Sequence, residues 1–168
     1  MDWSTFGAFA LANFIAAASG GLFKPGHWYA QLNRPAWTPP NWAFPVVWST
    51  LFLMNAAAGA IAWTAATAIS DGMVALPFIV YGVSLCFNFA WSALFFGLRR
   101  MDLALVDVVF LWMTIAAVLV LFAPLSPLAA GLVAPYLAWV TLAGVLNLRM
   151  IQLNPAAASE GVGDRAST

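Results

Sequence analysis

The chain has 168 residues, of which 64% are hydrophobic and only 7% are charged. Soluble globular domains are about half apolar and about a quarter charged, so this composition excludes that class. Six basic residues balance six acidic ones, which leaves no net positive charge to attract nucleic acid. The mean hydropathy of +0.90 indicates a membrane protein.

Long stretches without charged residues divide the chain into membrane spans. A spanning helix needs about 20 mostly apolar residues. Two of the spans share one charge-free interval, which Pro124 and Pro127 divide. The predicted spans cover about residues 5–22, 43–69, 74–97, 102–122 and 128–152. We therefore predict an all-α integral membrane bundle of five transmembrane helices.

These spans form a single predicted domain over residues 1–153, followed by a disordered C-terminal tail at residues 154–168. The tail is rich in Ala, Ser and Gly, which is typical of frayed chain ends.

The basic residues indicate how the bundle is oriented. Five spans place the termini on opposite sides, and the side with the N-terminus, Asp71 and Ser126 has no Lys or Arg in its loops. The other side holds all six basic residues: Lys24, Arg34, Arg99, Arg100, Arg149 and Arg165. Because basic loops stay in the cytoplasm, we predict the N-terminus outside and the C-terminus in the cytoplasm.

The connection at residues 23–42 is long, and it is rich in proline and aromatic residues. Proline fixes the backbone, so this loop is stiffer than a Gly/Ser tether. Its aromatic side chains favour two interpretations, a lid over a cavity or anchoring at the membrane interface. The stretch 28–33 is long enough for one or two helical turns.

Polar residues inside the spans are either packing contacts or parts of a site. Amides at Asn13, Asn55 and Asn147 suit hydrogen bonds between helices. Asn88 lies three residues before Trp91 and seven before Phe95, so the three share a helical face. An amide beside aromatic rings suits an apolar ligand with one polar handle.

Asp107 is the acid that lies well within a predicted span. We expect an ion pair with Arg99, Arg100 or Arg149 rather than a proton relay, since no second buried acid extends a relay.

Metal chemistry has little support in the sequence. One histidine, His27, and one cysteine, Cys86, cannot build a four-ligand zinc site, and we predict neither a metal site nor a required cofactor. The residues also form no recognisable set for acid–base hydrolysis or nucleotide binding.

Small residues recur every four positions in several spans, which lets helices approach closely. The stripe Gly82, Cys86 and Ala90 in the third span is our expected contact for a homodimer. Internal packing of the bundle gives the same pattern and is the alternative.

The chain contains nine tryptophans. The indole rings of Trp48 and Trp139 fall in the membrane half nearer the loop or close to mid-membrane, and small neighbours such as Ala138 and Ala143 leave room beside them. Such rings can line a slot for a flat aromatic ligand.

Three ordered motifs carry a resemblance to a known family. They are WYAQLNRPAWTPPNWAFPVVW at 28–48, LCFNFAWSALFFG at 85–97 and PYLAWVTLAGVLN at 135–147. With these motifs the chain resembles the TspO/MBR family, the tryptophan-rich sensory proteins of bacteria and the mitochondrial translocator or peripheral benzodiazepine receptor. The similarity covers about residues 6–153.

The resemblance implies a five-helix bundle, often dimeric, with a pocket beneath the first loop. It implies porphyrins such as protoporphyrin IX or haem, and other hydrophobic small molecules, as ligands in a lipid bilayer. The implied ligand-binding residues are Trp28, Tyr29, Pro40, Trp48, Asn88, Trp91, Trp139 and Ala143. The implied function is a membrane receptor or sensor regulating tetrapyrrole-linked or stress responses.

Two alternatives remain beside sensing. The first is that the protein transports porphyrin. The second is that it is an enzyme that degrades porphyrin in light, with Trp48 and Trp139 in catalytic roles. No other enzyme activity is expected. Sterol binding is doubtful, because Leu148 stands where the family's sterol motif has an aromatic residue. The charge asymmetry favours the inner bacterial membrane, and the outer membrane is the alternative proposed within the family.

Overall fold

A computed structural model describes residues 2–69 and 74–159. Within these residues the chain is helical and contains no strand. The elements are α1 (Trp3–Leu22), α2 (His27–Gln31), α3 (Ala43–Ile69), α4 (Ala75–Ser92), the π-helix η1 (Ala93–Gly97), α5 (Met101–Phe122), α6 (Pro127–Leu153) and the 3-10 helix η2 (Pro155–Ala157).

Five of these helices are long and apolar enough to cross a membrane: α1, α3, α4 continued by η1, α5 and α6. The prediction of an all-α five-span protein is therefore confirmed, and the observed bounds differ from the predicted spans by at most two residues. The predicted turn at Asp71 lies outside the described residues.

Local sequence explains where two of the long helices begin. Asp2 caps α1, since its carboxylate accepts from the backbone N–H groups of Ser4 and Thr5. The hydroxyl of Ser4 also donates to this carboxylate and lowers the pKa of Asp2. Ser126 caps α6, and Pro127 fills the first helical position, where a missing N–H costs nothing.

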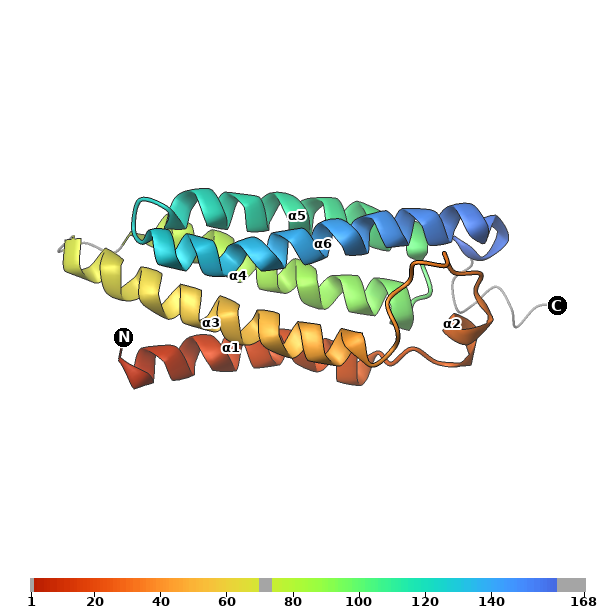
Figure 1. Ribbon diagram of the computed structural model, residues 1–168, viewed down its shortest axis with the longest axis horizontal. Helices are drawn as coiled ribbons and strands as arrows, with labels where there is room; N and C mark the ends of the chain where they lie inside the picture. Colours follow the sequence, from red (N-terminus) through yellow and green to blue (C-terminus); the bar gives the residue numbers. More distant parts are fainter. Residues whose placement is uncertain (1, 70–73, 160–168) are drawn as a thin grey trace.

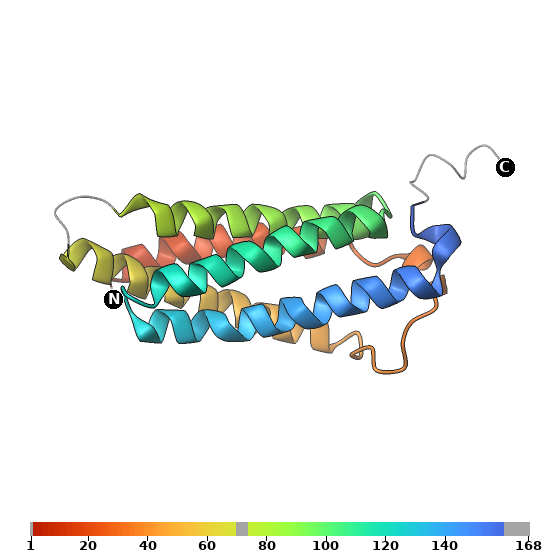
Figure 2. The same ribbon diagram turned by 90° about the horizontal axis from the view of Figure 1, so that it is seen from above.

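The helices form a ring in which each packs on two neighbours. In spatial order α1 packs on α3, α3 on α6, α6 on α5, α5 on α4, and α4 returns to α1. The N-terminal end of α1 and the C-terminal end of α6 lie at opposite ends of the bundle (Figure 1, Figure 2). The loop that carries α2 lies at the end of the bundle where α6 ends (Figure 1).

Small side chains let α1 and α3 approach closely. Ala58, Ala60 and Ala62 of α3 are fully buried. At Gly59 an added Cβ atom would lie 2.4 Å from Cδ1 of Phe9 in α1. The absence of a side chain at Gly59 therefore makes room for the Phe9 ring.

A buried hydrogen-bond network joins α1, α3 and α4. Asn55 donates to the side-chain oxygen of Asn13 (3.0 Å), and Asn13 donates to the Tyr81 hydroxyl (2.5 Å). The Tyr81 hydroxyl in turn donates to the backbone carbonyl of Asn55 (3.1 Å). The expected helix-joining role of Asn13 and Asn55 is thus observed.

The predicted ion pair of Asp107 is wrong. Arg100 instead pairs with Asp102, at 2.7 Å from Nη2 to Oδ2. Asp107 is buried, and its Oδ2 has no hydrogen-bond partner among the described residues. Asp102 lies in the first turn of α5, only two residues from Arg100, so its carboxylate is within reach of the guanidinium. Asp107 lies further along α5, away from this end of the helix.

The tail expected to be disordered from residue 154 is ordered over its first residues. Asn154 donates to the carbonyls of Asn33 and Met150, both at 2.8 Å. The carbonyl of Ala158, which is buried, accepts from the backbone N–H of Asp102. These contacts fix residues 154–159 against the bundle, and residues 160–168 lie outside the described part of the chain.

Candidate functional site

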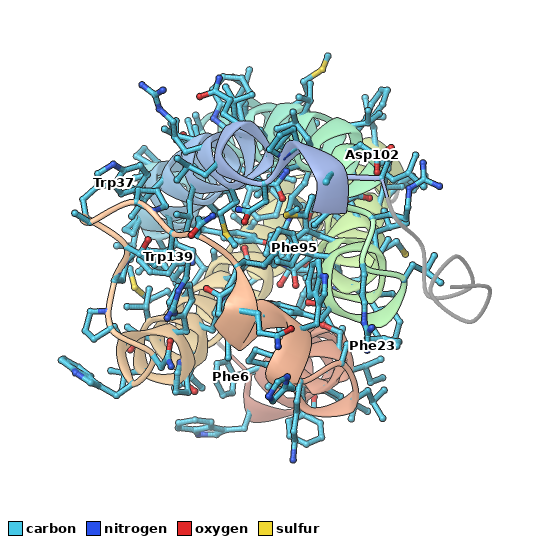
Figure 3. The ribbon with its side chains drawn as sticks, turned by 90° about the vertical axis from the view of Figure 1, so that its right-hand side faces the viewer. Phe6, Phe23, Trp37, Phe95, Asp102 and Trp139 are labelled. Carbon is cyan, nitrogen blue, oxygen red and sulfur yellow. The ribbon has the colours of Figure 1, made fainter. Side chains whose placement is uncertain are left out.

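A cavity of about 1040 Å³ lies inside the bundle at the end covered by the loop. Its walls come from α1, α3, α4 with η1, and α6, and most of its lining is apolar. Figure 3 looks onto this end, with Phe95 near the centre of the bundle and Trp139 to one side.

Aromatic rings from α3 and α6 form one wall of the cavity. Trp48 and Trp139 meet edge to face, with ring centroids 6.4 Å apart. Phe52 stacks on Trp48 at 5.4 Å, and Phe44 meets Trp139 at 5.9 Å. Ala143, one turn after Trp139, lines the cavity without filling it. This wall is therefore aromatic and largely apolar.

A second wall comes from the end of α4 and from η1. Asn88 is buried and lines the cavity together with Trp91 and Phe95. Trp91 stacks on Phe95 with centroids 5.0 Å apart. In η1 the N–H of Leu98 bonds the carbonyl of Ala93, five residues back. This wider turn sets the direction in which Phe95 points.

The loop covers the end of the cavity through α2. Trp28 and Tyr29 are buried and pack edge to face on Phe95, and Tyr29 also packs on Phe96. The guanidinium of Arg34 lies over the Tyr29 ring at 5.3 Å. The loop therefore has a fixed seat above the cavity.

A polar contact fastens the loop to the end of α6. The N–H of Asn33 donates to Oδ1 of Asn154 (2.9 Å), and Nδ2 of Asn154 donates back to the carbonyl of Asn33 (2.8 Å). We call this reciprocal pair the Asn33–Asn154 latch.

Several buried polar atoms of the cavity walls have no hydrogen-bond partner in the described part of the chain. Two are indole donors, Nε1 of Trp91 and Nε1 of Trp139. A third is an acceptor, Oδ1 of Asn147, whose Nδ2 donates to the carbonyl of Met101 at 2.9 Å. Buried polar groups are normally paired. These three atoms are covered by their neighbours, so a ligand in the cavity would reach them only after the surrounding side chains shift.

The structure brings six of the eight residues of the sequence-based site prediction to the cavity. They are Tyr29, Trp48, Asn88, Trp91, Trp139 and Ala143. Trp28 does not line the cavity, because it packs on Phe95 from the loop side. Pro40 lines a separate shallow hollow within the loop, beside Thr38 and Pro39.

Sequence reasoning missed the contribution of α1. Asn13, Phe14, Ala17 and Gly20 of this helix all line the cavity. Asn13 was expected only to join helices, and the apolar or small side chains of Phe14, Ala17 and Gly20 carry no chemical signal. Only the spacing of Ala and Gly indicated that α1 makes close approaches. The role of Asn147 as a lining residue was also missed, since a helix-joining amide was the expected role.

Comparison with known proteins places this arrangement in a family. Residues 8–153 match the sequence pattern of the TspO/MBR family. The chain is 41% identical to the tryptophan-rich sensory protein of Cereibacter sphaeroides over 155 residues, covering 92% of this chain and 94% of that one. It is 36% identical to Protein CrtK of Rhodobacter capsulatus, covering 92% and 96% of the two chains.

The similarity extends to animal proteins. The translocator protein of Homo sapiens is 36% identical over 148 residues, which are 86% of this chain and 87% of the human one. The match spans all five long helices. The chain therefore belongs to the TspO/MBR family of multi-pass membrane proteins.

Proposed function

We propose that this protein is a membrane receptor or sensor that binds a porphyrin, such as protoporphyrin IX, in the tryptophan-lined cavity. The observation that carries the proposal is the cavity of about 1040 Å³ with aromatic rings on two walls. Small-molecule pockets are commonly about 300–1,000 Å³, so this one suits a large, flat, apolar ligand. Relatives named tryptophan-rich sensory protein and translocator protein support a sensor or receptor.

Unpaired polar atoms beside the aromatic walls would orient such a ligand once the side chains around them shift. They are the indole N–H groups of Trp91 and Trp139, which would donate, and Oδ1 of Asn147, which would accept. The rings would stack on or abut the macrocycle. In this scheme the aromatic walls supply affinity and the polar atoms fix orientation.

The test is a titration of protoporphyrin IX into purified protein in the dark, followed by tryptophan quenching. Trp48→Phe and Trp139→Phe should each raise the Kd by about tenfold, which corresponds to about 1.4 kcal/mol. Trp3→Phe is the matched control, because Trp3 is 79% exposed at the far end of α1. Unsaturable quenching that is equal in all four proteins would mean that porphyrin only partitions into the detergent, and would refute the proposal.

The same samples separate the alternatives. Illumination that destroys bound porphyrin, and does so only when Trp48 and Trp139 are present, would favour the degrading enzyme. Flux of porphyrin into sealed vesicles would favour the transporter. Binding without either outcome is what the sensor requires.

We further propose that the loop end faces the cytoplasm of a bacterial inner membrane. Lys24, Arg34, Arg99, Arg100 and Arg149 belong to that end, and the positive-inside rule supports this orientation. Cysteine labelling from either side of intact cells tests it.

The homodimer proposed from the sequence rests on Gly82 and Cys86, which are exposed on α4, and on half-buried Ala90. If α4 is the contact, oxidation should link two copies through Cys86. A monomer under the same conditions would contradict it.

A further inference from the structure

The seam between α1 and α3 is closed at one level and open at another. Phe9 against Gly59, and Asn13 against Asn55, hold the two helices together. Both helices also line the cavity, over Ala10–Gly21 of α1 and Phe44–Ala56 of α3, so the cavity borders this seam from the level of Asn13 to the loop end.

Several of these lining residues are also strongly exposed. On α1 they include Leu11 (60%) and Phe14 (70%), and on α3 Leu53 (62%). Deep lining residues are nearly inaccessible, as Asn147 at 1% and Phe95 at 2% demonstrate. Contact with the cavity alone therefore does not produce high exposure, and the residues on α1 and α3 stand at the rim of an opening.

The spacing of the rim residues places them on facing stripes. On α3, Pro45, Ser49 and Leu53 are four residues apart, and all three line the cavity and are exposed. On α1, Leu11 and Phe14 are three residues apart. The opening is thus a slot along the side of the bundle, and it continues to Pro25 and Asn41, where the loop leaves and rejoins the helices.

A ligand could also enter the cavity past the loop that carries α2, but this route is less direct. There α2 buries Trp28 and Tyr29 against η1, and the Asn33–Asn154 latch fastens the loop to α6. Entry by that route would require these contacts to break. The side slot requires none of them to change.

We infer that the cavity is loaded from within the bilayer, through a lateral portal between α1 and α3, and that a lipid acyl chain occupies this portal between ligands. The rim side chains Leu11, Phe14 and Leu53 belong to membrane-spanning helices and present hydrocarbon to the lipid. The ligand class is therefore molecules that dissolve in the membrane before they bind. The inference rests on the proposed ligand-binding function.

The first test measures association and dissociation rates of protoporphyrin IX with protein in lipid nanodiscs. Ser49→Phe narrows the slot and should slow both rates by about tenfold, whereas Phe14→Ala widens it and should speed both. A folding defect would not produce opposite changes of this kind. Ile79→Phe, an equal bulk on the lipid-facing surface of α4, is the control and should change neither rate.

Opening the loop distinguishes the two routes. Asn154→Ala removes the latch, and the inference expects wild-type rates. Faster rates in Asn154→Ala together with unchanged rates in Ser49→Phe would overturn the lateral portal and establish entry through the loop. Unchanged rates in both Ser49→Phe and Phe14→Ala would overturn it as well.

A second test needs no porphyrin and therefore separates this inference from the proposed function. The protein is placed in vesicles of lipids with brominated acyl chains, which quench tryptophan fluorescence at short range. A chain in the portal should quench the fluorescence of Trp139. The quenching due to Trp139 is the difference between the wild type and Trp139→Phe, and we call this difference its share. That share should fall in Ser49→Phe and persist in Ile79→Phe. Equal quenching of Trp139 in both variants would overturn the portal, even if porphyrin binds. Absence of porphyrin binding with the expected lipid quenching would refute only the proposed function.

Discussion

The ring of Phe9 occupies the space that a side chain on Gly59 would need, since a Cβ there would lie 2.4 Å from Phe9 Cδ1. We predict that Gly59→Val lowers the free energy of unfolding by about 1–3 kcal/mol, because the ring cannot move without disturbing its neighbours. Thermal unfolding in detergent measures the change.

Gly82→Ala is the control for this substitution, because nothing lies within 4 Å of the added Cβ. It should stay within about 0.5 kcal/mol of the wild type. Combining Gly59→Val with Phe9→Ala should cost less than the sum of the two single changes, since removal of the ring relieves the clash. Strict additivity would show that Phe9 is not the cause.

The Tyr81 hydroxyl both accepts a hydrogen bond from Asn13 and donates one to Asn55. Tyr81→Phe should therefore destabilise the bundle by about 0.6–1.7 kcal/mol, which are the mean and the largest value measured for hydrogen bonds between membrane helices. Thr114→Val is the control, because the Thr114 hydroxyl donates only to carbonyls of its own helix. It should be neutral or stabilising, and an equal loss in both variants would contradict the assignment.

Asp107 and Asp102 should respond in opposite directions to removal of their charge. Asp107→Asn should raise stability, because it replaces a buried carboxylate that no described basic residue pairs with by an uncharged amide. Asp102→Asn should lower it by about 0.2–1 kcal/mol, since its half-exposed pair with Arg100 is weakened. Unfolding midpoints of the two variants test this, and a loss in Asp107→Asn would point to a function for the carboxylate.

The Asn33–Asn154 latch should control motion of the loop. Asn154→Ala removes three hydrogen bonds, two with Asn33 and one with the carbonyl of Met150. The two with Asn33 are worth about 1 kcal/mol each, so the backbone amide of Asn33 should exchange hydrogen at least about tenfold faster. Gln152→Ala removes only an exposed contact with Arg149 and should leave this exchange unchanged. Unaltered exchange in Asn154→Ala would mean that packing of α2 alone holds the loop.

The sequence predicted the helices well because one rule governs them. Charged residues are costly in a membrane, so the gaps between Asp2 and Lys24 or between Arg34 and Asp71 mark spans directly. The end of α4, where η1 begins, was harder to predict. A π-helix differs from an α-helix by one hydrogen-bond step, and the ALFFG segment carries no pattern that distinguishes them.

The site was predictable where side chains have distinctive chemistry. Asn88 and Trp91 share a face of α4, and helical spacing alone places them together. The contacts of Trp28 and Pro40 depend on the path of the loop, which no periodicity fixes. The wall from α1 was missed because Ala17 and Gly20 matter there by being small, and small residues look the same whether they line a cavity or pack a core.

The π-helical turn has a consequence for how this family member can tolerate changes in length. It holds one more residue than an α-helical path between the same ends. Deleting one residue from Ala93–Gly97 would therefore leave an ordinary α-helical path and would not rotate the residues beyond it. The same deletion within the α-helical part of α4 would turn every later side chain of that helix by about 100°. The chain should thus tolerate the loss of one residue in Ala93–Gly97 better than in Ala75–Ser92, and the contact at risk is local, the seat of α2 on Phe95.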